Sequence, residues 1–199
     1  MPGRLYAIAD ASFGDCVRLA EALFAGGARL VQVRNKKAGA REFLSQVERI
    51  LLFAPSDGRV VVNDRVDVAL LAGAAGVHLG QTDLPPAAAR RILGPGRIIG
   101  FSTHNLEQAV EADNLPVDYI AVGPVFATST KDNPDPVVGV EKLAIICLAV
   151  KKPVVAIGGI TLDNAKAALS AGAASVAVIG DLLAHEDVAQ RTRMFERGL

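Results

Sequence analysis

The chain has 199 residues, of which 51% are hydrophobic and 21% are charged. A chain of this length can bury one sizeable core and is shorter than most chains that divide, so we expect one domain over residues 1–199. Basic and acidic residues both number 21, which leaves no net basic field to attract nucleic acid or an acidic membrane. The sequence shows neither a signal peptide nor an apolar run of the roughly 20 residues that a membrane span needs, so we expect a cytoplasmic protein.

Short apolar runs rich in β-branched residues recur along the chain and predict eight strands. The runs are nearly continuous in apolar residues, which is typical of parallel strands buried on both faces. They are LYAIAD (5–10), LVQVRN (30–35), RVVVND (59–64), GVHLG (76–80), RIIGFS (97–102), DYIAVGP (118–124), PVVAIGG (153–159) and SVAVIG (175–180).

The stretches between these runs are rich in Ala, Leu and Glu and predict helices, for example over 16–27, 40–53, 85–94, 105–113, 140–150 and 161–173. Several of them stop at Gly26, Gly73, Gly94 or Gly172, where a left-handed C-terminal cap costs least. A strand followed by a helix, repeated along the whole chain, predicts a single (β/α)8 TIM barrel. A doubly wound open sheet is the alternative.

The cysteines and two of the three histidines indicate structural roles. Cys16 and Cys147 are isolated on predicted helices without CxxC spacing, so we expect buried, reduced thiols. His78 lies within an apolar strand and His185 in a late polar segment. His104 follows a strand, and its role is open between a proton shuttle and a cap for the next helix.

Polar residues concentrate just after the predicted strands. In a barrel these positions surround one mouth, at the C-terminal ends of the strands, where function normally resides. Asp10 lies at the end of the first strand, and two roles are open for it: supporting a site residue or capping a helix. The others are Gln32, Arg34, Lys36, Asn63, Asp64, Gln81, Asp83, Ser102, Thr103, His104, the run from Thr128 to Asp132, and the glycines Gly158, Gly159 and Gly180.

Arg34 and Lys36 indicate a diphosphate site. Together with Gln32, they are spaced two residues apart at the end of a buried strand. An arginine can hold a phosphate in a bidentate fork, and a lysine acts as a point charge.

Asp64 and Asp83 lie at neighbouring strand ends and can converge on one hard cation. This arrangement favours Mg²⁺, which takes one or two carboxylates and completes its shell with water and phosphate oxygens. The alternative makes Asp64 a cap for a helix beginning near Arg65 and Asp83 a loop residue before Pro85.

A second phosphate pocket is predicted where the last two strands end. Glycines in AIGGI and after SVAVIG let backbone N–H groups approach an anion, although turn geometry alone could also require them. Thr128, Ser129 and Thr130 would add hydroxyl donors, while Lys131 could reach the first phosphate. We expect the loop TKDNPDPVVG (130–139) to form a lid, because Pro and Asp break helices and strands.

The chain resembles the thiamin-phosphate synthase family in six motifs, which occur in the expected order and span essentially the whole sequence: VQVRNK, VVNDRVDVAL, GVHLGQTDL, IIGFSTH, DYIAVGPVFATSTKD and PVVAIGGI. The resemblance implies a TIM-barrel transferase that joins hydroxymethylpyrimidine diphosphate to a thiazole phosphate. Thiamin phosphate and pyrophosphate are the implied products. Mg²⁺ is the implied cofactor, and small phosphorylated molecules are the implied partners.

The resemblance also implies a role for each matching residue. It assigns the pyrimidine diphosphate to Gln32, Arg34, Lys36, Asn63 and Lys131, the pyrimidine to Ser102, Mg²⁺ to Asp64 and Asp83, and the thiazole phosphate to Thr128, Thr130, Gly159 and the turn from Ile179 to Gly180. Of these, Arg34, Lys36, Ser102 and Lys131 are the expected catalytic residues. Their cations would stabilise the departing pyrophosphate, and no covalent nucleophile is needed.

The chain departs from the family pattern at a few places. Asn35 stands where Glu is common, Ala9 where Thr is common, and Gly180 where Ser is frequent. The chain also begins almost at its first strand, without the helix that often covers the lower end of the barrel. We therefore expect an exposed apolar patch there or a homo-oligomer.

Two other functions are alternatives to the synthesis of thiamin phosphate. A thiazole tautomerase on the same barrel would also use His104, but such paralogues often lose the metal and diphosphate residues that are present here. A non-catalytic regulatory paralogue would bind phosphates without turnover, and only the departures favour it.

Overall fold

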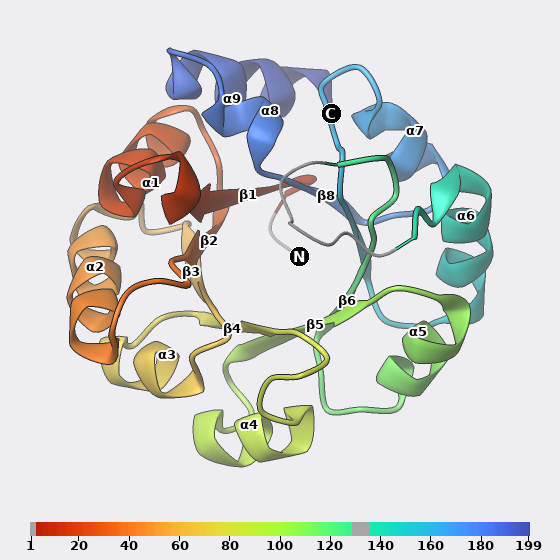
Figure 1. Ribbon diagram of the computed structural model, residues 1–199, viewed down its shortest axis with the longest axis horizontal. Helices are drawn as coiled ribbons and strands as arrows, with labels where there is room; N and C mark the ends of the chain where they lie inside the picture. The colour runs from red at the N-terminus through yellow and green to blue at the C-terminus, as the bar shows by residue number, and fades with distance from the viewer. Residues whose placement is uncertain (1–2, 129–135) are drawn as a thin grey trace.

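The computed structural model describes residues 3–128 and 136–199, and its strands form a closed barrel (Figure 1). Every pair of neighbouring strands is parallel, and β1 closes the ring by pairing with β8. The strands are β1 (Leu5–Asp10), β2 (Leu30–Arg34), β3 (Arg59–Asn63), β4 (Gly76–Leu79), β5 (Ile98–Thr103), β6 (Tyr119–Val122), β7 (Val154–Ile157) and β8 (Ser175–Val178). The predicted TIM barrel is confirmed, and the open sheet is wrong.

Helices surround the barrel on its outer side (Figure 1). They are the 3-10 turn η1 (Ala11–Phe13) and the helices α1 (Cys16–Ala25), α2 (Ala40–Phe53), α3 (Val66–Ala72), α4 (Pro86–Leu93), α5 (Leu106–Asp113), α6 (Gly139–Ala149), α7 (Ala165–Ser170), α8 (Gly180–Leu183) and α9 (Val188–Gly198). The sequence patterns do not predict α8 and α9. The N-cap of α9 is Asp187, whose carboxylate accepts a hydrogen bond from the Gln190 N–H at 2.8 Å.

The predicted left-handed caps have different outcomes. Gly73 is left-handed, and Gly172 also has a positive φ. Gly94 has a positive φ of 75°, but its ψ of −177° lies outside the left-handed helical region. Gly26 is right-handed, so this prediction is wrong. A Cβ atom there would lie 2.4 Å from Cβ of Thr192, so Gly26 allows α1 to pack closely against α9.

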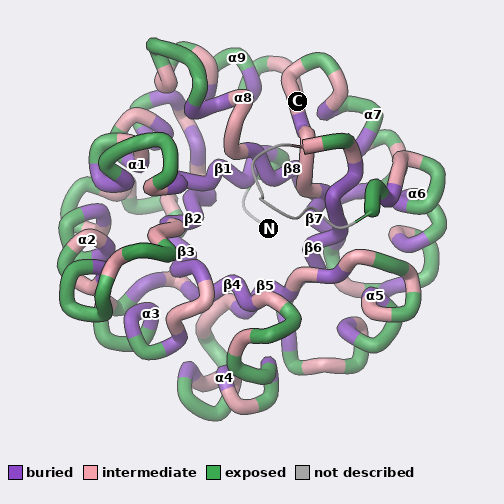
Figure 2. Tube along the Cα trace, in the orientation of Figure 1, coloured by how far each residue is buried: buried purple, intermediate pink, exposed green. Residues whose placement is uncertain are grey.

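Apolar residues form two cores, one on each side of the strands. The larger core fills the layer between the barrel and its helices, and the smaller one fills the barrel interior. Figure 2 shows the strands as a buried ring within helices whose outer sides are exposed. Burial on both faces explains why the strand sequences are almost continuously apolar. The two tyrosines of the inner core, Tyr6 and Tyr119, are each about 1% exposed or less.

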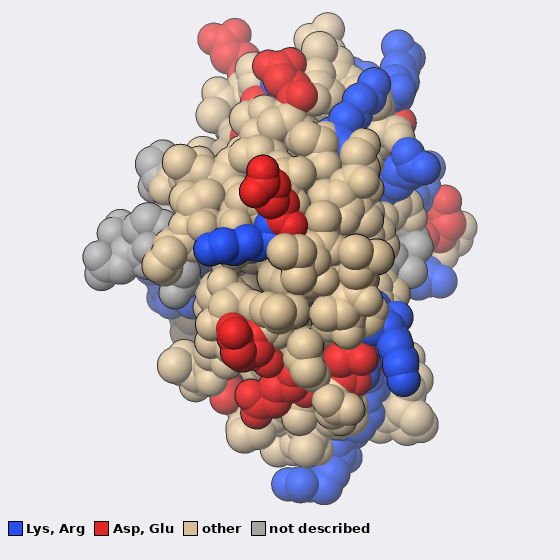
Figure 3. Space-filling model, turned by 90° about the vertical axis from the view of Figure 1, so that its right-hand side faces the viewer, with Lys and Arg blue, Asp and Glu red and all other residues tan. Residues whose placement is uncertain are grey.

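The distribution of charge on the surface agrees with the equal numbers of acidic and basic residues. Both acidic and basic side chains occur on the face that carries α6 (Figure 3). Within the part of the chain that the structure describes, no helix is long and apolar enough to cross a membrane.

Candidate functional site

A cavity of about 780 Å³ opens at the C-terminal ends of the strands. This size is typical of small-molecule sites. Its wall contains the predicted site residues Gln32, Arg34, Lys36, Asn63, Asp64, Asp83, Ser102, Thr128, Gly159, Ile179 and Gly180. Thr130 and Lys131 lie outside the described residues, as does most of the predicted lid. The barrel therefore gathers into one cavity every predicted site residue that the structure describes.

The guanidinium of Arg34 is held by a buried carboxylate. Arg34 and Asp10 are paired in the register of β1 and β2, and Arg34 Nη1 donates to Asp10 Oδ2. The other carboxylate oxygen of Asp10 accepts the Ser12 N–H at 2.9 Å and so caps η1. Both roles left open for Asp10 are thus present. Because Asp10 is only 2% exposed, this pairing fixes the direction of the Arg34 side chain at the cavity wall.

Two carboxylates and one ammonium group meet beside Arg34. Asp64 lies 3.4 Å from Lys36, between Oδ2 and Nζ. Burial raises the pKa of the Asp64 carboxyl, and the neighbouring Asp83 carboxyl raises it further, while Lys36 lowers it. Asp83 is oriented by the Gly80 N–H, which donates to its Oδ2 at 2.7 Å. These two side chains are the candidates for holding a hard cation.

The backbone of Asp64 is unusual. Its φ of 62° makes it the one described residue other than glycine with a positive φ. Such a conformation costs free energy and occurs often at functional sites. The N-cap of α3 is Arg65, without a side-chain capping bond, so the interpretation of Asp64 as that cap is wrong.

His78 projects into the site from β4. Its Nε2 lies 2.8 Å from Ser102 Oγ, and its Nδ1 lies 2.8 Å from the hydroxyl of Tyr119. Burial lowers the pKa of His78 to about 4, although Asp83 opposes this shift, so the ring is neutral at pH 7. A neutral imidazole donates from one nitrogen and accepts at the other, which ties the direction of the Ser102 hydroxyl to that of Tyr119.

A chain of buried hydrogen bonds continues below His78. The Tyr119 and Tyr6 hydroxyls lie 2.8 Å apart, and Gln32 Nε2 donates to the Tyr6 hydroxyl at 2.9 Å. Burial raises the pKa of Tyr6 to about 12, so these phenols are neutral. The predicted site residues Gln32 and Ser102 are therefore linked through side chains inside the barrel.

His104 lies on the cavity wall after β5. Its Nδ1 lies 2.7 Å from the carbonyl oxygen of Gly123 and therefore donates to it. The cap of α5 is Asn105, whose side chain accepts the Gln108 N–H at 2.9 Å. The interpretation of the His104 side chain as the cap is thus wrong, and its role as a proton shuttle stays a prediction.

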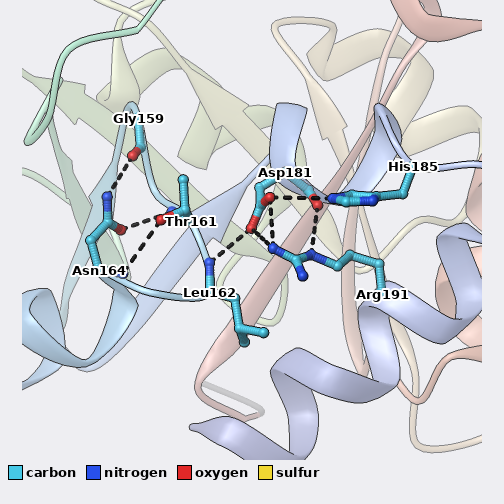
Figure 4. Close-up of polar contacts among 7 residues, drawn as sticks. All are labelled: Gly159, Thr161, Leu162, Asn164, Asp181, His185 and Arg191. Carbon is cyan, nitrogen blue, oxygen red and sulfur yellow. Dashed lines mark hydrogen bonds and ion pairs between the residues drawn. The ribbon is translucent and has the colours of Figure 1, made fainter.

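Two turns that follow β7 and β8 form another part of the cavity wall. Gly159 has a φ of 64°, and a Cβ atom there would lie 2.3 Å from the carbonyl oxygen of Ala127. Only glycine fits at this point. Figure 4 shows that Asn164 closes the first turn: its Nδ2 donates to the Gly159 carbonyl at 2.9 Å, and its Oδ1 accepts the Thr161 N–H at 2.8 Å.

Comparison with known proteins identifies the family. The family model described as thiamine monophosphate synthase matches residues 5–182. The chain is 48% identical to the thiamine-phosphate synthase of Koribacter versatilis, covering 96% of this chain and 93% of that protein. For the thiamine-phosphate synthase of Anaeromyxobacter dehalogenans the identity is 46%, with coverage of 98% and 89%. The chain belongs to the thiamine-phosphate synthase family. The resemblance found in the sequence motifs is confirmed, and so is the expectation of a transferase.

Solved structures agree with this membership. A thiamine phosphate pyrophosphorylase from Pyrococcus furiosus has a TM-score of 0.91 and 39% identity, and the match covers 98% of this chain and 94% of that one. The geranylgeranylglyceryl phosphate synthase of Thermoplasma acidophilum has a TM-score of 0.72 at 14% identity, which shows a shared fold alone.

One departure from the thiamine-phosphate synthase pattern has a structural explanation. Asn35 Oδ1 accepts the N–H groups of Lys37 and Ala38 at 3.2 and 3.1 Å, and its Nδ2 donates to Gln46 Oε1 at 3.1 Å. Asn35 thus stabilises the loop that presents Lys36 to the cavity.

Several residues that form or support the cavity wall carry no clear signal in the sequence. The interior positions of Tyr6, His78 and Tyr119 look like ordinary core positions in their apolar strands. Asp181 follows a strand by several residues within a helical turn. A polar residue at an inward-facing strand position is the one signal that could have singled out His78.

Proposed function

We propose that this chain condenses hydroxymethylpyrimidine diphosphate with hydroxyethylthiazole phosphate to give thiamin phosphate and pyrophosphate. The main support is that the cations of Arg34 and Lys36 line the same cavity as the glycine turns at Gly159 and Gly180. The cations suit a diphosphate, and the turns offer backbone N–H groups to a monophosphate. Two phosphorylated substrates would therefore lie side by side in the same mouth.

The residues present fit Mg²⁺. Asp64 and Asp83 bring two carboxylates together, and their mutual repulsion contributes to the raised pKa of Asp64. Residues 3–128 and 136–199 contain no cluster of three or more His, Cys, Asp or Glu side chains suited to a metal. Mg²⁺ suits such a sparse donor set, because it retains water and takes phosphate oxygens. When bound, the ion would neutralise charge on the leaving diphosphate.

The protein would act mainly by holding charge and geometry. The bond between the pyrimidine methylene carbon and the diphosphate oxygen breaks, and its electron pair leaves with pyrophosphate. Arg34 and Lys36 stabilise that negative charge, and Lys131 is proposed to join them. The lone pair of the thiazole nitrogen then forms the new bond to the methylene carbon, so no base is required. Binding both substrates in one cavity places these atoms next to each other.

The pyrimidine is proposed to contact Ser102, and Gln32 is proposed to help hold the diphosphate. The neutral His78 and the buried tyrosines hold these two side chains in a fixed arrangement. Asn63, in register with His78 on the neighbouring strand, adds an amide to the wall. Thr128 and Thr130 are proposed to complete the thiazole phosphate site.

The test is formation of thiamin phosphate and pyrophosphate from the two precursors, with Mg²⁺ and with a chelator. The Asp64→Ala variant should lower kcat/KM at least about 100-fold, because it removes a group that holds the metal. Asp67→Ala is the matched control, since Asp67 is an exposed carboxylate on α3 that pairs with Arg65. It should keep activity within about twofold.

Folded wild-type protein that binds the thiazole phosphate but forms no thiamin phosphate would overturn the proposal. Proton exchange on the thiazole phosphate would then indicate a tautomerase, and binding without any turnover would indicate a regulatory paralogue.

A further inference from the structure

Asp181 places a negative charge at the proposed phosphate site. It directly follows Gly180 and lines the same cavity. Its side chain is 16% exposed, so solvent screens its charge only in part. A carboxylate in this position would repel a phosphate unless another group neutralised it.

Arg191 supplies that neutralising charge from α9. Its Nη2 lies 2.8 Å from both carboxylate oxygens of Asp181, and its Nε donates to the Asp181 carbonyl oxygen at 3.3 Å. The arginine is also partly buried, and its guanidinium carbon lies 5.7 Å from the centre of the Phe195 ring. His185, half exposed, lies 3.5 Å from Asp181 Oδ1. Figure 4 shows Arg191 and His185 converging on the one carboxylate.

The same carboxylate also reaches the turn that follows β7. Asp181 Oδ2 accepts the N–H of Leu162 at 2.8 Å. One residue earlier, the Thr161 N–H is held by Asn164, which also holds the carbonyl of Gly159. Two sets of hydrogen bonds, joined by the backbone between Thr161 and Leu162, therefore connect Arg191 through Asp181 to the Gly159 turn (Figure 4).

We propose that Arg191 and Asp181 form a positioning pair for the phosphate of the second substrate. Arg191 cancels the charge of Asp181, and Asp181 holds the turn at Gly180 at a fixed separation from the turn at Gly159. Neither side chain needs to touch the reacting atoms. The inference rests on the proposed function, because it assigns the monophosphate to these two turns.

The pair predicts an effect on one substrate alone. Arg191→Met leaves the Asp181 charge uncompensated and should weaken binding of thiazole phosphate about tenfold, measured by calorimetry without the other substrate. In the full assay of Arg191→Met, the KM for thiazole phosphate should rise by a similar factor. The KM for the pyrimidine diphosphate should stay within about twofold, since Arg34 and Lys36 follow β2, which is separated from β8 by β1.

The matched control is Arg193→Met. Arg193 is exposed on the same helix, and its Nη1 donates to the Ala25 carbonyl at 3.4 Å. Its removal should leave both KM values unchanged. Arg191→Lys retains the positive charge but loses the bidentate geometry of the guanidinium. Its loss of affinity for thiazole phosphate should be smaller than that of Arg191→Met, so it gives a second, milder variant for the test.

The double variant Asp181→Asn with Arg191→Met separates charge from packing. Without the carboxylate there is no charge to cancel, so binding of thiazole phosphate should return to within about threefold of the wild type. Unchanged binding in both Arg191 variants, or equal losses for the two substrates, would overturn the inference while wild-type turnover still supports the function. Wild-type protein that does not bind thiazole phosphate would overturn the proposed function itself.

Discussion

Nε2 of His78 lies 2.8 Å from Oγ of Ser102, across the pair of strands β4 and β5. Both side chains line the cavity, and the ring of His78 also stacks on Tyr119 with their centroids 5.6 Å apart. A buried, uncharged imidazole therefore sets the orientation of a hydroxyl at the proposed pyrimidine site.

His78 should make stability depend on pH. Its pKa is about 4 in the folded protein, against 6.5 for an ordinary histidine, so the unfolded chain binds the proton first as pH falls. The contribution of His78 to the free energy of unfolding is complete above pH 6.5 and is lost as the pH falls towards 4. Between pH 7 and pH 5 the loss is about 2 kcal/mol.

Urea unfolding of the wild type and of His78→Gln at the two pH values checks this prediction. Other titrating groups are common to both proteins and cancel in the comparison. Equal losses of unfolding free energy in the two proteins would show that His78 is protonated normally in the folded state.

Replacement of Asp64 by asparagine should separate stability from activity. The pKa of Asp64 is raised by burial and by Asp83, so its charged form destabilises the folded protein at pH 7. We expect Asp64→Asn to raise the unfolding free energy of the metal-free protein by up to about 1 kcal/mol. The same change should lower activity at least about 100-fold.

Thermal unfolding with and without Mg²⁺ provides the readout. The wild type should gain stability with the ion, because a ligand that binds only the folded state stabilises it. A gain of the same size in Asp64→Asn would exclude Asp64 as a metal ligand.

Gly159→Ala should damage both folding and phosphate binding. The new Cβ would lie 2.3 Å from the Ala127 carbonyl oxygen at a φ of 64°, so the turn must shift. We expect a loss of about 1–3 kcal/mol in stability and weaker binding of thiazole phosphate.

Gly73→Ala is the control for the backbone strain. Gly73 has a φ of 74° with nothing within 4 Å of the added Cβ, and it lies far from the cavity wall at the end of α3. The Gly73→Ala substitution should lower the free energy of unfolding by about 1 kcal/mol and leave substrate binding unchanged. Similar binding losses in both variants would argue against a specific role of the Gly159 turn.

Neither cysteine should react readily in the folded protein. Burial raises the pKa of both Cys16 and Cys147 to about 11, and Cys16 Sγ also donates to Gln46 Oε1 at 3.3 Å. The reactive thiolate is therefore scarce at pH 8, and alkylation should be about 100-fold slower than for an ordinary thiol. Mass spectrometry after timed alkylation gives the rates, and unfolded protein provides the reference. Fast labelling of the partly exposed Cys147 would show that its helix opens.

Local sequence patterns are sufficient to predict the barrel and the location of its mouth. Eight buried β-branched runs, each followed by a helical stretch, have few alternatives to a closed parallel sheet, and parallel strands bring their C-terminal ends to one side. Polar residues at those ends, such as Arg34, Asp64 and Ser102, therefore had to meet. Their spacing within each motif was enough to indicate phosphate and metal chemistry.

Which side chains support one another depends on contacts between segments that are distant in the sequence. Asp10 and Arg34 are 24 positions apart, while His78 and Tyr119 are separated by 41, and nothing local links either pair. Gly26 ends α1 as expected, but it is not left-handed, and its close contact with Thr192 on α9 explains the glycine. Such partners depend on strand register and on helix packing across the fold. Local propensity and periodicity describe neighbours along the chain, whereas hydrogen-bond partners and the pKa of a buried group depend on neighbours in space.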